Sequence, residues 1–414
     1  MPMTMYSPTR ILVAPSGFKE SLSAVEVADG IAAGVRRVLP GVRVDQFPVP
    51  DGGEGTLEIL SLRPNTRFHR SKVTGPVGDQ VRSRWLEFTG DTPEESVAVI
   101  EMASTAGLSL VPRDMRDPGA TTTTGVGEQL AEILNRGIRR IVVGCGDSGT
   151  SDGGAGALRA LGLKIYDTHG NEIAQGGAAL AKAHTLDASG MHPGLAEADI
   201  TLACNIHNIL TGPRGVARVF GPQKGATPAQ VEELEQGLEH FADLLVDTFH
   251  PQSDIHSGRG SGASGGLGAG LMSIGATARD RFEVLLGDLP ATEDIDALIE
   301  QADLVITAEG AVDFQTPRGK VPAEIARRAQ STGVPVIALA GSLGKGAHDV
   351  YEVGISAIQS IMTVPMALED AVRDGRKLLI DATERAIRML QIGCVVSARQ
   401  EQAVRHRYQN RESA

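Results

Sequence analysis

Cysteine and aromatic residues are scarce in this chain of 414 residues. The three cysteines, Cys145, Cys204 and Cys394, are widely separated and form no CxxC pair, which excludes a disulfide framework and a structural zinc ribbon and favours a reducing compartment. Aromatic residues make up only 3% of the chain, so the sequence offers few stacking platforms for bases or sugars. The ten histidines form no HxxxH or HxH pair, and we therefore expect no zinc site.

Long apolar runs and an excess of positive charge are also lacking. No stretch approaches 18 consecutive apolar residues, which excludes a transmembrane helix. The first ten residues lack the apolar core of a signal peptide, so we expect a cytoplasmic protein. With 39 basic and 51 acidic residues the net charge is −12, so we expect no nucleic-acid or membrane partner. A local basic pocket for a phosphate is still compatible with this charge.

The order of apolar and amphipathic segments predicts an α/β protein. Residues 11–14 and 42–49 are typical of strands, and the amphipathic segment 27–39 between them is typical of a helix. Ser23 and Glu26 have the spacing of a capping box before that helix. The length of the chain favours two domains.

The middle and the end of the chain differ in pattern. Residues 66–102 contain three strand-like segments divided by turns, which favours antiparallel or mixed pairing. Residues 256–270 form a glycine tract that we expect to be flexible, and we expect the polar tail 397–414 to fray. The remaining predicted elements are strands at 139–146, 198–205, 303–310 and 334–341 and helices at 127–137, 154–162, 227–249, 322–330 and about 367–391.

Glycine is abundant, with 50 residues, and it gathers in short loops together with carboxylates or lysine. Three such loops, 50–56, 144–156 and 307–320, directly follow predicted strands, and ligands of open α/β sheets bind at the carboxyl ends of strands. Glycine lets backbone N–H groups approach an anion. Carboxylates in the same loops suit a bound Mg²⁺ or proton removal from a substrate hydroxyl.

Three lysines, Lys19, Lys224 and Lys320, would add the positive charge that phosphoryl transfer needs, and the pattern predicts a small-molecule kinase. The plainer interpretation is that glycine loops are tight turns and that lone lysines are solvated. Residues 260–265 match GxGxxG but follow no strand, so dinucleotide binding is not favoured. The sequence contains no GxxxxGK[ST] motif and no HRD/DFG set, so ATP must be held by another architecture.

From about residue 9 to 392 the chain resembles the bacterial class I glycerate kinases. Seven segments in the family's order carry this resemblance: APSGFKESLSA (14–24), DGGEGT (51–56), IEMASTAGLSLVP (100–112), GDSGTSDGGAGALRALG (146–162), FGPQKGATPAQV (220–231), SGASGGLGAGL (261–271) and AEGAVDFQTPRGKVP (308–322). The resemblance implies phosphorylation of D-glycerate by ATP with Mg²⁺, and 2-phosphoglycerate rather than 3-phosphoglycerate as the product.

The resemblance also implies two α/β domains with the active site in the cleft between them. A flavodoxin-like domain with a mainly parallel sheet would comprise residues 1–62 and 286–414. A mixed-sheet domain like that of restriction endonucleases would comprise residues 63–285.

Candidate site residues come from the loops and the resemblance together. The catalytic candidates are Asp152, Lys19, Asp313 and Lys320, and the metal candidates are Asp51 and Asp313. The candidates for binding substrate or nucleotide are Ser16, Gly52, Gly53, Glu54, Ser148, Gly153, Gly154, Asn205, Lys224, Gly265, Gly266, Glu309 and Gln315. Asp152 is either the general base, or a group that orients the attacking hydroxyl, or simply the N-cap of the following helix.

Several motif positions depart from the family pattern, and they leave the substrate open. These positions are Ser16-Gly17, Glu20, the segment 146–152, Asn205 and Ala308. Asn in place of Asp keeps the shape but loses the charge. Two alternatives to a glycerate kinase therefore stand: a kinase for a related small hydroxy acid, or a catalytically silent paralogue that binds a nucleotide or metabolite. Whether the chain forms a homo-oligomer is also left open.

Overall fold

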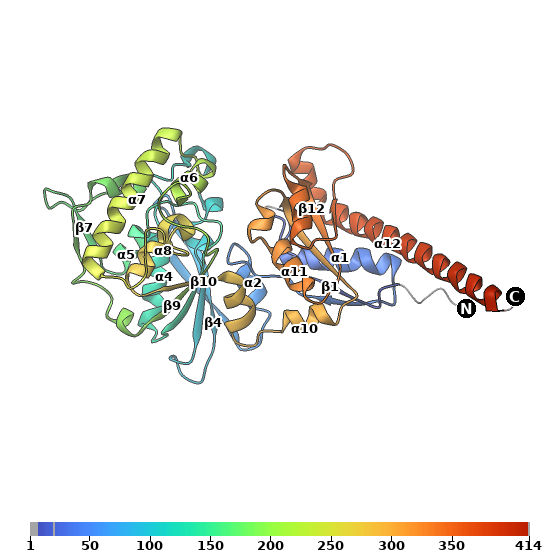
Figure 1. The fold of residues 1–414 in the computed structure, drawn as a ribbon. Coiled ribbons are helices and arrows are strands. Elements are labelled where there is room, and N and C mark those ends of the chain that lie inside the picture. Colours follow the sequence, from blue (N-terminus) through green and yellow to red (C-terminus); the bar gives the residue numbers. More distant parts are fainter. Residues whose placement is uncertain (1–6, 20, 413–414) are drawn as a thin grey trace. The chain divides into compact units, whose positions relative to one another are not determined.

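Residues from both ends of the chain share one folding unit in the computed structural model, which describes residues 7–19 and 21–412, without the side chains at 401 and 404–412. Unit 1 comprises Met1–Val49 and Asp294–Ala414, and unit 2 comprises Pro50–Glu293 (Figure 1). The departure at Glu20 lies outside the described residues. Among the described helices, none is long and apolar enough to cross a membrane.

Unit 1 is built on a five-stranded sheet in the order β13-β12-β11-β1-β2. Every neighbouring pair is parallel, and Ile11 of β1 is in register with Leu304 of β11. The mainly parallel sheet is thereby confirmed. The strands are β1 (Arg10–Val13), β2 (Arg43–Gln46), β11 (Leu304–Val312), β12 (Val336–Leu343) and β13 (Ala357–Ser360). The helices are α1 (Ala24–Val38), α10 (Ile295–Glu300), α11 (Val321–Gln330) and α12 (Leu368–Glu412).

Helix α1 begins where the sequence predicts. The Ser23 hydroxyl accepts from the backbone N–H of Glu26 at 3.2 Å, and the Glu26 carboxylate accepts from the backbone N–H of Ser23 at 2.8 Å. This reciprocal pair is the predicted capping box. The helix packs on α12, where a Cβ at Gly34 would lie 2.5 Å from the Thr383 side chain, so only glycine allows this approach.

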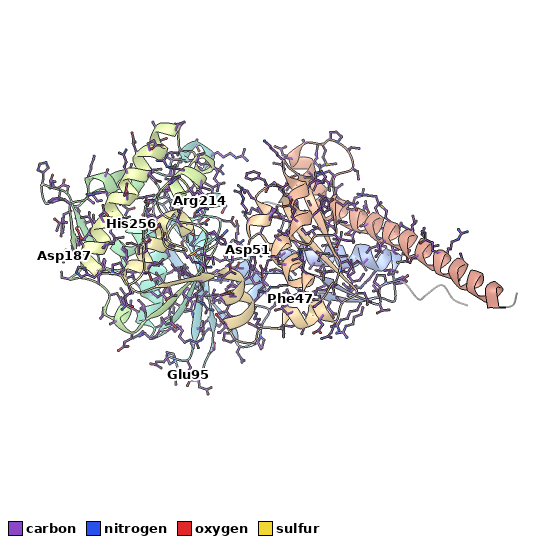
Figure 2. All side chains as sticks on the ribbon, viewed as in Figure 1. Phe47, Asp51, Glu95, Asp187, Arg214 and His256 are labelled. Atoms are coloured by element: carbon purple, nitrogen blue, oxygen red, sulfur yellow. The ribbon has the colours of Figure 1, made fainter. Side chains whose placement is uncertain are left out.

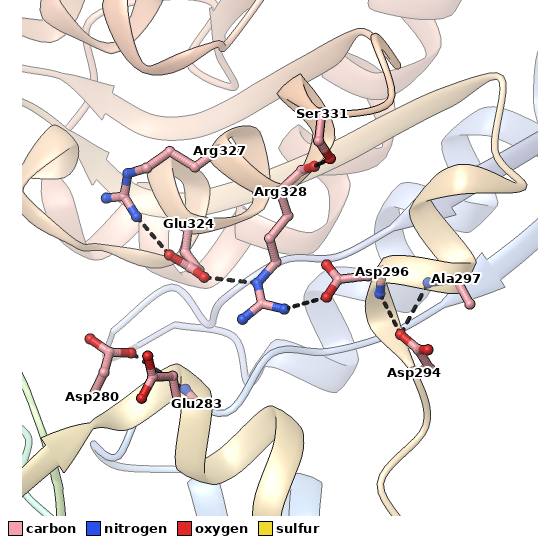
Figure 3. Close-up of polar contacts among 9 residues, drawn as sticks. All are labelled: Asp280, Glu283, Asp294, Asp296, Ala297, Glu324, Arg327, Arg328 and Ser331. Atoms are coloured by element: carbon pink, nitrogen blue, oxygen red, sulfur yellow. Dashed lines mark hydrogen bonds and ion pairs between the residues drawn. The ribbon is translucent and has the colours of Figure 1, made fainter.

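Ion pairs fix α11 beside α10. Arg328 of α11 donates to Glu324 at 2.8 Å and to Asp296 of α10 at 2.9 Å, while Arg327 also pairs with Glu324 at 2.6 Å (Figure 3). Because Asp296 and Arg327 are exposed, we expect these ion pairs to add little to the stability of the fold.

Unit 2 contains a six-stranded mixed sheet in the order β10-β9-β6-β5-β4-β3. Strands β3, β4 and β5 pair antiparallel, and β5, β6, β9 and β10 pair parallel, which confirms the mixed sheet. These strands are β3 (Thr66–Thr74), β4 (Gln80–Phe88), β5 (Val97–Glu101), β6 (Arg140–Gly144), β9 (Asp199–Cys204) and β10 (Thr277–Asp280), and β7 (Lys164–Tyr166) and β8 (Thr185–Asp187) form a separate pair.

Helices bury one large apolar core against this sheet, which includes Trp85, Leu130, Phe241 and Leu267. The helices of unit 2 are α2 (Thr56–Leu60), α3 (Ala103–Ala106), α4 (Thr124–Asn135), α5 (Ala155–Ala160), α6 (Val216–Phe220), α7 (Pro228–Phe249), α8 (Ala263–Ser273) and α9 (Arg281–Glu283), which continues into a π-helical turn at Val284–Asp288. The predicted start of α7 at Pro228 is confirmed.

Two expectations about glycine and the chain end are wrong. Residues 263–270 of the tract expected to be flexible belong to the buried helix α8 (Ala263–Ser273). Its glycines allow close packing, since a Cβ at Gly268 would lie 2.1 Å from the carbonyl oxygen of Gly260. The tail does not fray at residue 397, because α12 continues to Glu412.

The edges of two other predicted segments differ from the structure. The loop predicted at 307–320 begins inside β11, which extends to Val312. The predicted domain boundaries at 62 and 285 fall inside unit 2. The flanking segments belong to unit 2 because their leucines share one apolar cluster with β4, and this cluster includes Leu57, Leu60, Leu86, Leu285 and Leu289.

Candidate active site

The predicted site residues of unit 2 lie at the carboxyl ends of its parallel strands. The backbone N–H of Cys145, after β6, donates to the carbonyl of Ala203 in β9 at 3.0 Å. The next N–H, of Gly146, donates to Gly52 at 3.0 Å and brings the 50–56 loop to the same edge. This is the edge where open α/β sheets bind ligands.

Two carboxylates flank Gly53 in this region. Asp51, labelled in Figure 2, accepts from the backbone N–H of Gly53 at 2.9 Å. Asp147 accepts from the backbone N–H of the exposed Glu54 at 3.2 Å. A Cβ at Gly53 would lie 2.5 Å from Asp147 Oδ2, so the approach needs glycine. Sequence reasoning treated Asp147 only as a departure from the family, because its place beside Asp51 depends on a loop almost a hundred residues away.

Asp152 is completely buried and holds two helix starts together. Its carboxylate accepts from the backbone N–H groups of Thr123 at 2.8 Å, Gly154 at 3.1 Å and Gly156 at 3.1 Å, and also from the Thr123 hydroxyl. Burial raises the pKa of Asp152, and these hydrogen bonds act in the opposite direction. Both oxygens are thus engaged at the starts of α4 and α5, as in helix capping.

Lys224 is buried with 2% of its surface exposed. Its ammonium group donates to the Ser148 hydroxyl at 2.9 Å and to the carbonyl oxygen of Thr150 at 2.5 Å. Burial lowers the pKa of Lys224 to about 7, and the charge of Asp152 partly opposes this shift.

The predicted glycines of this unit serve the packing of two loops. Gly153, Gly154, Gly265 and Gly266 all adopt positive φ, from 63° to 89°. A Cβ at Gly265 would lie 1.9 Å from the carbonyl oxygen of Thr150, which leaves no room for any other residue. These glycines therefore bring the loop at the start of α8 against the loop after β6.

Asn205 follows β9 at the same edge. Its side-chain oxygen accepts from the backbone N–H of His207 at 3.1 Å, which forms a tight turn. The side chain is partly exposed, so Asn205 borders the site.

Glu101 is a candidate that sequence reasoning missed. It ends β5, is 4% exposed, and accepts from the backbone N–H of Leu57 at the start of α2 at 2.7 Å. Burial raises the pKa of Glu101 to about 7, with smaller raising effects from Asp51 and Glu54. The sequence signals were an acidic residue at the end of an otherwise apolar strand and its place in the motif 100–112.

A second cluster of predicted residues lies in unit 1, around Lys320. The Lys320 ammonium lies 3.0 Å from Glu309 and 3.5 Å from Asp313, and it donates to the carbonyl of Ala311. Asp313 also accepts from the backbone N–H of Gln315 at 2.8 Å, and the Gln315 side chain is exposed. The lysine and both carboxylates are thus preassembled at the end of β11.

Ser16 and Lys19 follow the adjacent strand β1. The Ser16 hydroxyl donates to the carbonyl of Ala308 in β11 at 3.0 Å. Lys19 is an exposed residue. Its backbone lies close to Gly310 of β11, where a Cβ would be 3.6 Å from the backbone nitrogen of Lys19. Because β1 and β11 are parallel, this loop and the Lys320 cluster are on the same edge of the sheet.

The residues present fit a magnesium ion that is shared with phosphate groups. Within the described residues, no three His, Cys, Asp or Glu side chains gather to hold a metal alone. Mg²⁺ in kinases needs only one or two protein carboxylates, because substrate phosphates and water supply its other ligands. The pair Asp51 and Asp147 in unit 2 and the pair Glu309 and Asp313 in unit 1 offer such carboxylates.

Comparison with known proteins agrees with the resemblance seen in the motifs. Residues 11–391 match the model of the glycerate kinase family. The glycerate kinase of Bacillus subtilis (strain 168) is 42% identical over 363 residues, which cover 87% of this chain and 92% of the relative. The glycerate 2-kinase of Escherichia coli (strain K12) is 40% identical over 385 residues, which cover 93% of this chain and 98% of the relative.

The fold agrees as well. A crystal structure from Salmonella typhimurium LT2, named as a glycerate kinase 2, superposes with a TM-score of 0.73 at 39% identity and covers 93% of this chain and 99% of that chain. Family, motif order and fold all point to transfer of a phosphoryl group to a hydroxyl group. The chain therefore belongs to the glycerate kinase family and is a kinase of this type.

Proposed function

We propose that the protein phosphorylates D-glycerate with ATP and forms 2-phosphoglycerate. The observation that carries this proposal is the position of the motif loops. Motif loops follow the carboxyl ends of parallel strands in both units. Lys320 is held beside Glu309 in unit 1, and Lys224 is held beside Ser148 in unit 2. Relatives at 40–42% identity are named glycerate kinase and glycerate 2-kinase.

The chemistry assigned to these residues is binding and charge neutralisation. Phosphoryl transfer needs positive charge around the transferring group, and Lys19 and Lys320 would supply it from unit 1. Asp51 and Asp313 would hold Mg²⁺ together with the phosphates of ATP, and the bound ion would neutralise charge on those phosphates. Glu309 orients Lys320 through their 3.0 Å ion pair.

Backbone and polar groups of the remaining motif residues would orient the two substrates. The residues assigned to this role are Ser16, Gly52, Gly53, Glu54, Ser148, Gly153, Gly154, Asn205, Lys224, Gly265, Gly266 and Gln315. Asp152 would act in catalysis as a positioning residue. Its carboxylate accepts hydrogen bonds from the backbone of Thr123 and Gly154 and thereby orders the loop that carries Ser148.

An ADP-release assay tests the proposed function. We expect turnover with D-glycerate and little with L-glycerate, tartronate or other hydroxy acids. Enolase added to the product separates the two isomers, because 2-phosphoglycerate is consumed directly and 3-phosphoglycerate is not. ADP release without a phosphorylated acid, or a product that enolase does not consume, would contradict the proposal.

A kinase for a related small hydroxy acid is the second candidate. The observation that favours it is the Asp147 carboxylate beside Gly53, at a position where the family pattern differs. Preferred turnover of another acid in the same assay would establish this candidate. ATP binding without any turnover would instead indicate a silent paralogue.

A further inference from the structure

Four residues of unit 2 form a largely buried polar cluster whose hydrogen-bonding groups are only partly satisfied within the fold. We call it the Lys224 cluster; its members are Lys224, Ser148, Thr150 and Ser151. Lys224 comes from the turn before α7, and the other three come from the loop after β6. Ser148 is partly exposed, whereas the other three side chains are at most 2% exposed, so the cluster opens to solvent at Ser148.

The ammonium group of Lys224 lacks a negative partner in contact with it. Among the described residues no carboxylate lies within 4.0 Å of it, and its two acceptors, the Ser148 hydroxyl and the Thr150 carbonyl, are neutral. The charge of Asp152 acts on it only from beyond that distance. A buried cation without a counter-ion in contact is costly, so proteins rarely keep one without compensation. One of its three N–H groups also finds no acceptor among the described residues.

Two hydroxyl groups of the cluster are also unsatisfied. Thr150 Oγ1 and Ser151 Oγ are buried and have no hydrogen-bond partner among the described residues. Most buried hydroxyl groups in folded proteins have a partner, and a buried polar atom without one destabilises the fold. The loop that holds the Lys224 ammonium through Ser148 and the Thr150 carbonyl thus also carries two unpartnered hydroxyls, and together these groups point to a ligand rich in hydrogen-bond acceptors.

We propose that the Lys224 cluster binds the carboxylate of the acceptor hydroxy acid and thereby selects acids over neutral polyols. This inference rests on the proposed function, because it assigns one part of the same substrate. Charge matching favours a carboxylate over the phosphates of ATP. The cluster offers one positive charge and neutral hydroxyl donors, which balance one negative charge, whereas a triphosphate carries several.

Direct binding measurements test this assignment. Isothermal titration calorimetry compares D-glycerate, glycerol and ATP on the full-length wild type and on Lys224→Met. We expect the variant to bind D-glycerate about 100-fold more weakly, because the substrate carboxylate loses its buried positive partner. The variant should bind ATP with an affinity within about 3-fold of the wild type. Its preference for D-glycerate over glycerol should shrink by the same factor. Unchanged D-glycerate binding by a folded variant, or loss of ATP binding alone, would overturn the assignment.

Two milder variants keep the test decisive if Lys224→Met does not fold. Thr150→Val and Ser151→Ala remove hydroxyls that have no partner, so we expect unchanged or higher melting temperatures and about 5-fold weaker D-glycerate binding. Ser273→Ala is the matched control, because its buried hydroxyl donates to Gly270 within α8 and its loss should lower stability without changing acid binding. Unchanged acid binding in both milder variants would overturn the assignment.

The proposed function fails separately from this inference. A wild type that binds hydroxy acids but transfers no phosphoryl group refutes the proposed function, and the variants still decide which residues hold the carboxylate. A wild type that binds no hydroxy acid refutes both.

Discussion

Two lysines of the motif loops, Lys320 of unit 1 and Lys224 of unit 2, have opposite surroundings. Lys320 is partly exposed and lies within 3.5 Å of two carboxylates, Glu309 and Asp313. Lys224 is buried and touches only neutral oxygens. The charge of Lys320 is balanced by contacts within the protein, whereas that of Lys224 would gain a contacting counter-charge only from a bound anion. A lysine in a glycine-rich motif thus predicts an anion site only when its burial and its partners are known.

Removal of Mg²⁺ should have the largest effect. It tests whether the carboxylates of the two units hold a metal ion as well as balancing lysine charge. Because ATP and the acid substrate are both anions, we expect EDTA to abolish turnover and added Mg²⁺ or Mn²⁺ to restore it. Steady-state ADP release measures both. Full activity in metal-free buffer would show that Asp51 and Asp313 have no metal to hold.

Lys320→Met should reduce kcat by about 100-fold, because it removes a charge near the transferred group and leaves two carboxylates without their partner. Steady-state kinetics with both substrates measure the effect. Lys377→Met is the control, since Lys377 is an exposed lysine on α12 of the same unit. Equal kinetics in the two variants would mean that Lys320 serves only the local ion pairs.

Asp152→Asn should mainly affect stability. Both carboxylate oxygens accept from backbone N–H groups, so the amide nitrogen of Asn would face a donor and cost about 1–3 kcal/mol of unfolding free energy. We expect kcat to stay within about 10-fold of the wild type. Urea denaturation and ADP release separate the two effects. A loss of about 100-fold in kcat at normal stability would instead identify Asp152 as a general base.

The pH dependence of stability gives the least direct test of the comparison. The pKa of Lys224 is about 7 in the folded protein against the ordinary lysine value of 10.5, so between these values the unfolded chain holds one more proton. Stability should therefore rise with pH from about 7 to 10.5, with a slope of at most about 1.4 kcal/mol per pH unit from this group. Urea denaturation of wild type and Lys224→Met across this window measures the slope, which the variant should lack. Equal slopes would mean that folding does not lower the pKa of Lys224.

Local signals in the sequence were enough to predict most elements. The capping box of Ser23 and Glu26 and the proline at Pro228 each mark a helix start within a few residues. The apolar runs of β1, β6 and β11 are also local signals. They predict parallel strands because a buried parallel strand needs apolar residues on both faces.

Features that depend on contacts between distant parts of the chain could not be predicted from the sequence. Glycines of α8 suggest flexibility until the backbone packed against Gly268 is known. Lys224 follows Gly-Pro-Gln, a typical surface turn, and only the fold shows that it is buried. Asp152 receives two of its hydrogen bonds from Thr123, which the sequence could not connect to it. The candidate residues were therefore predictable as a set, while their individual environments were not.

The pairing of β1 with β11 has a consequence for how the chain is made. Ile11 is in register with Leu304, so the first strand is synthesised almost three hundred residues before its neighbour. Unit 2, Pro50–Glu293, is continuous, so all of it leaves the ribosome before β11 does. Domains generally fold as units during synthesis, so unit 2 should fold first, while β1 has only β2 available as a neighbour and still lacks β11. Nascent chains stalled where Glu293 has just left the ribosome and β11 is still inside it would then contain a protease-resistant unit 2 preceded by a digestible N-terminal segment.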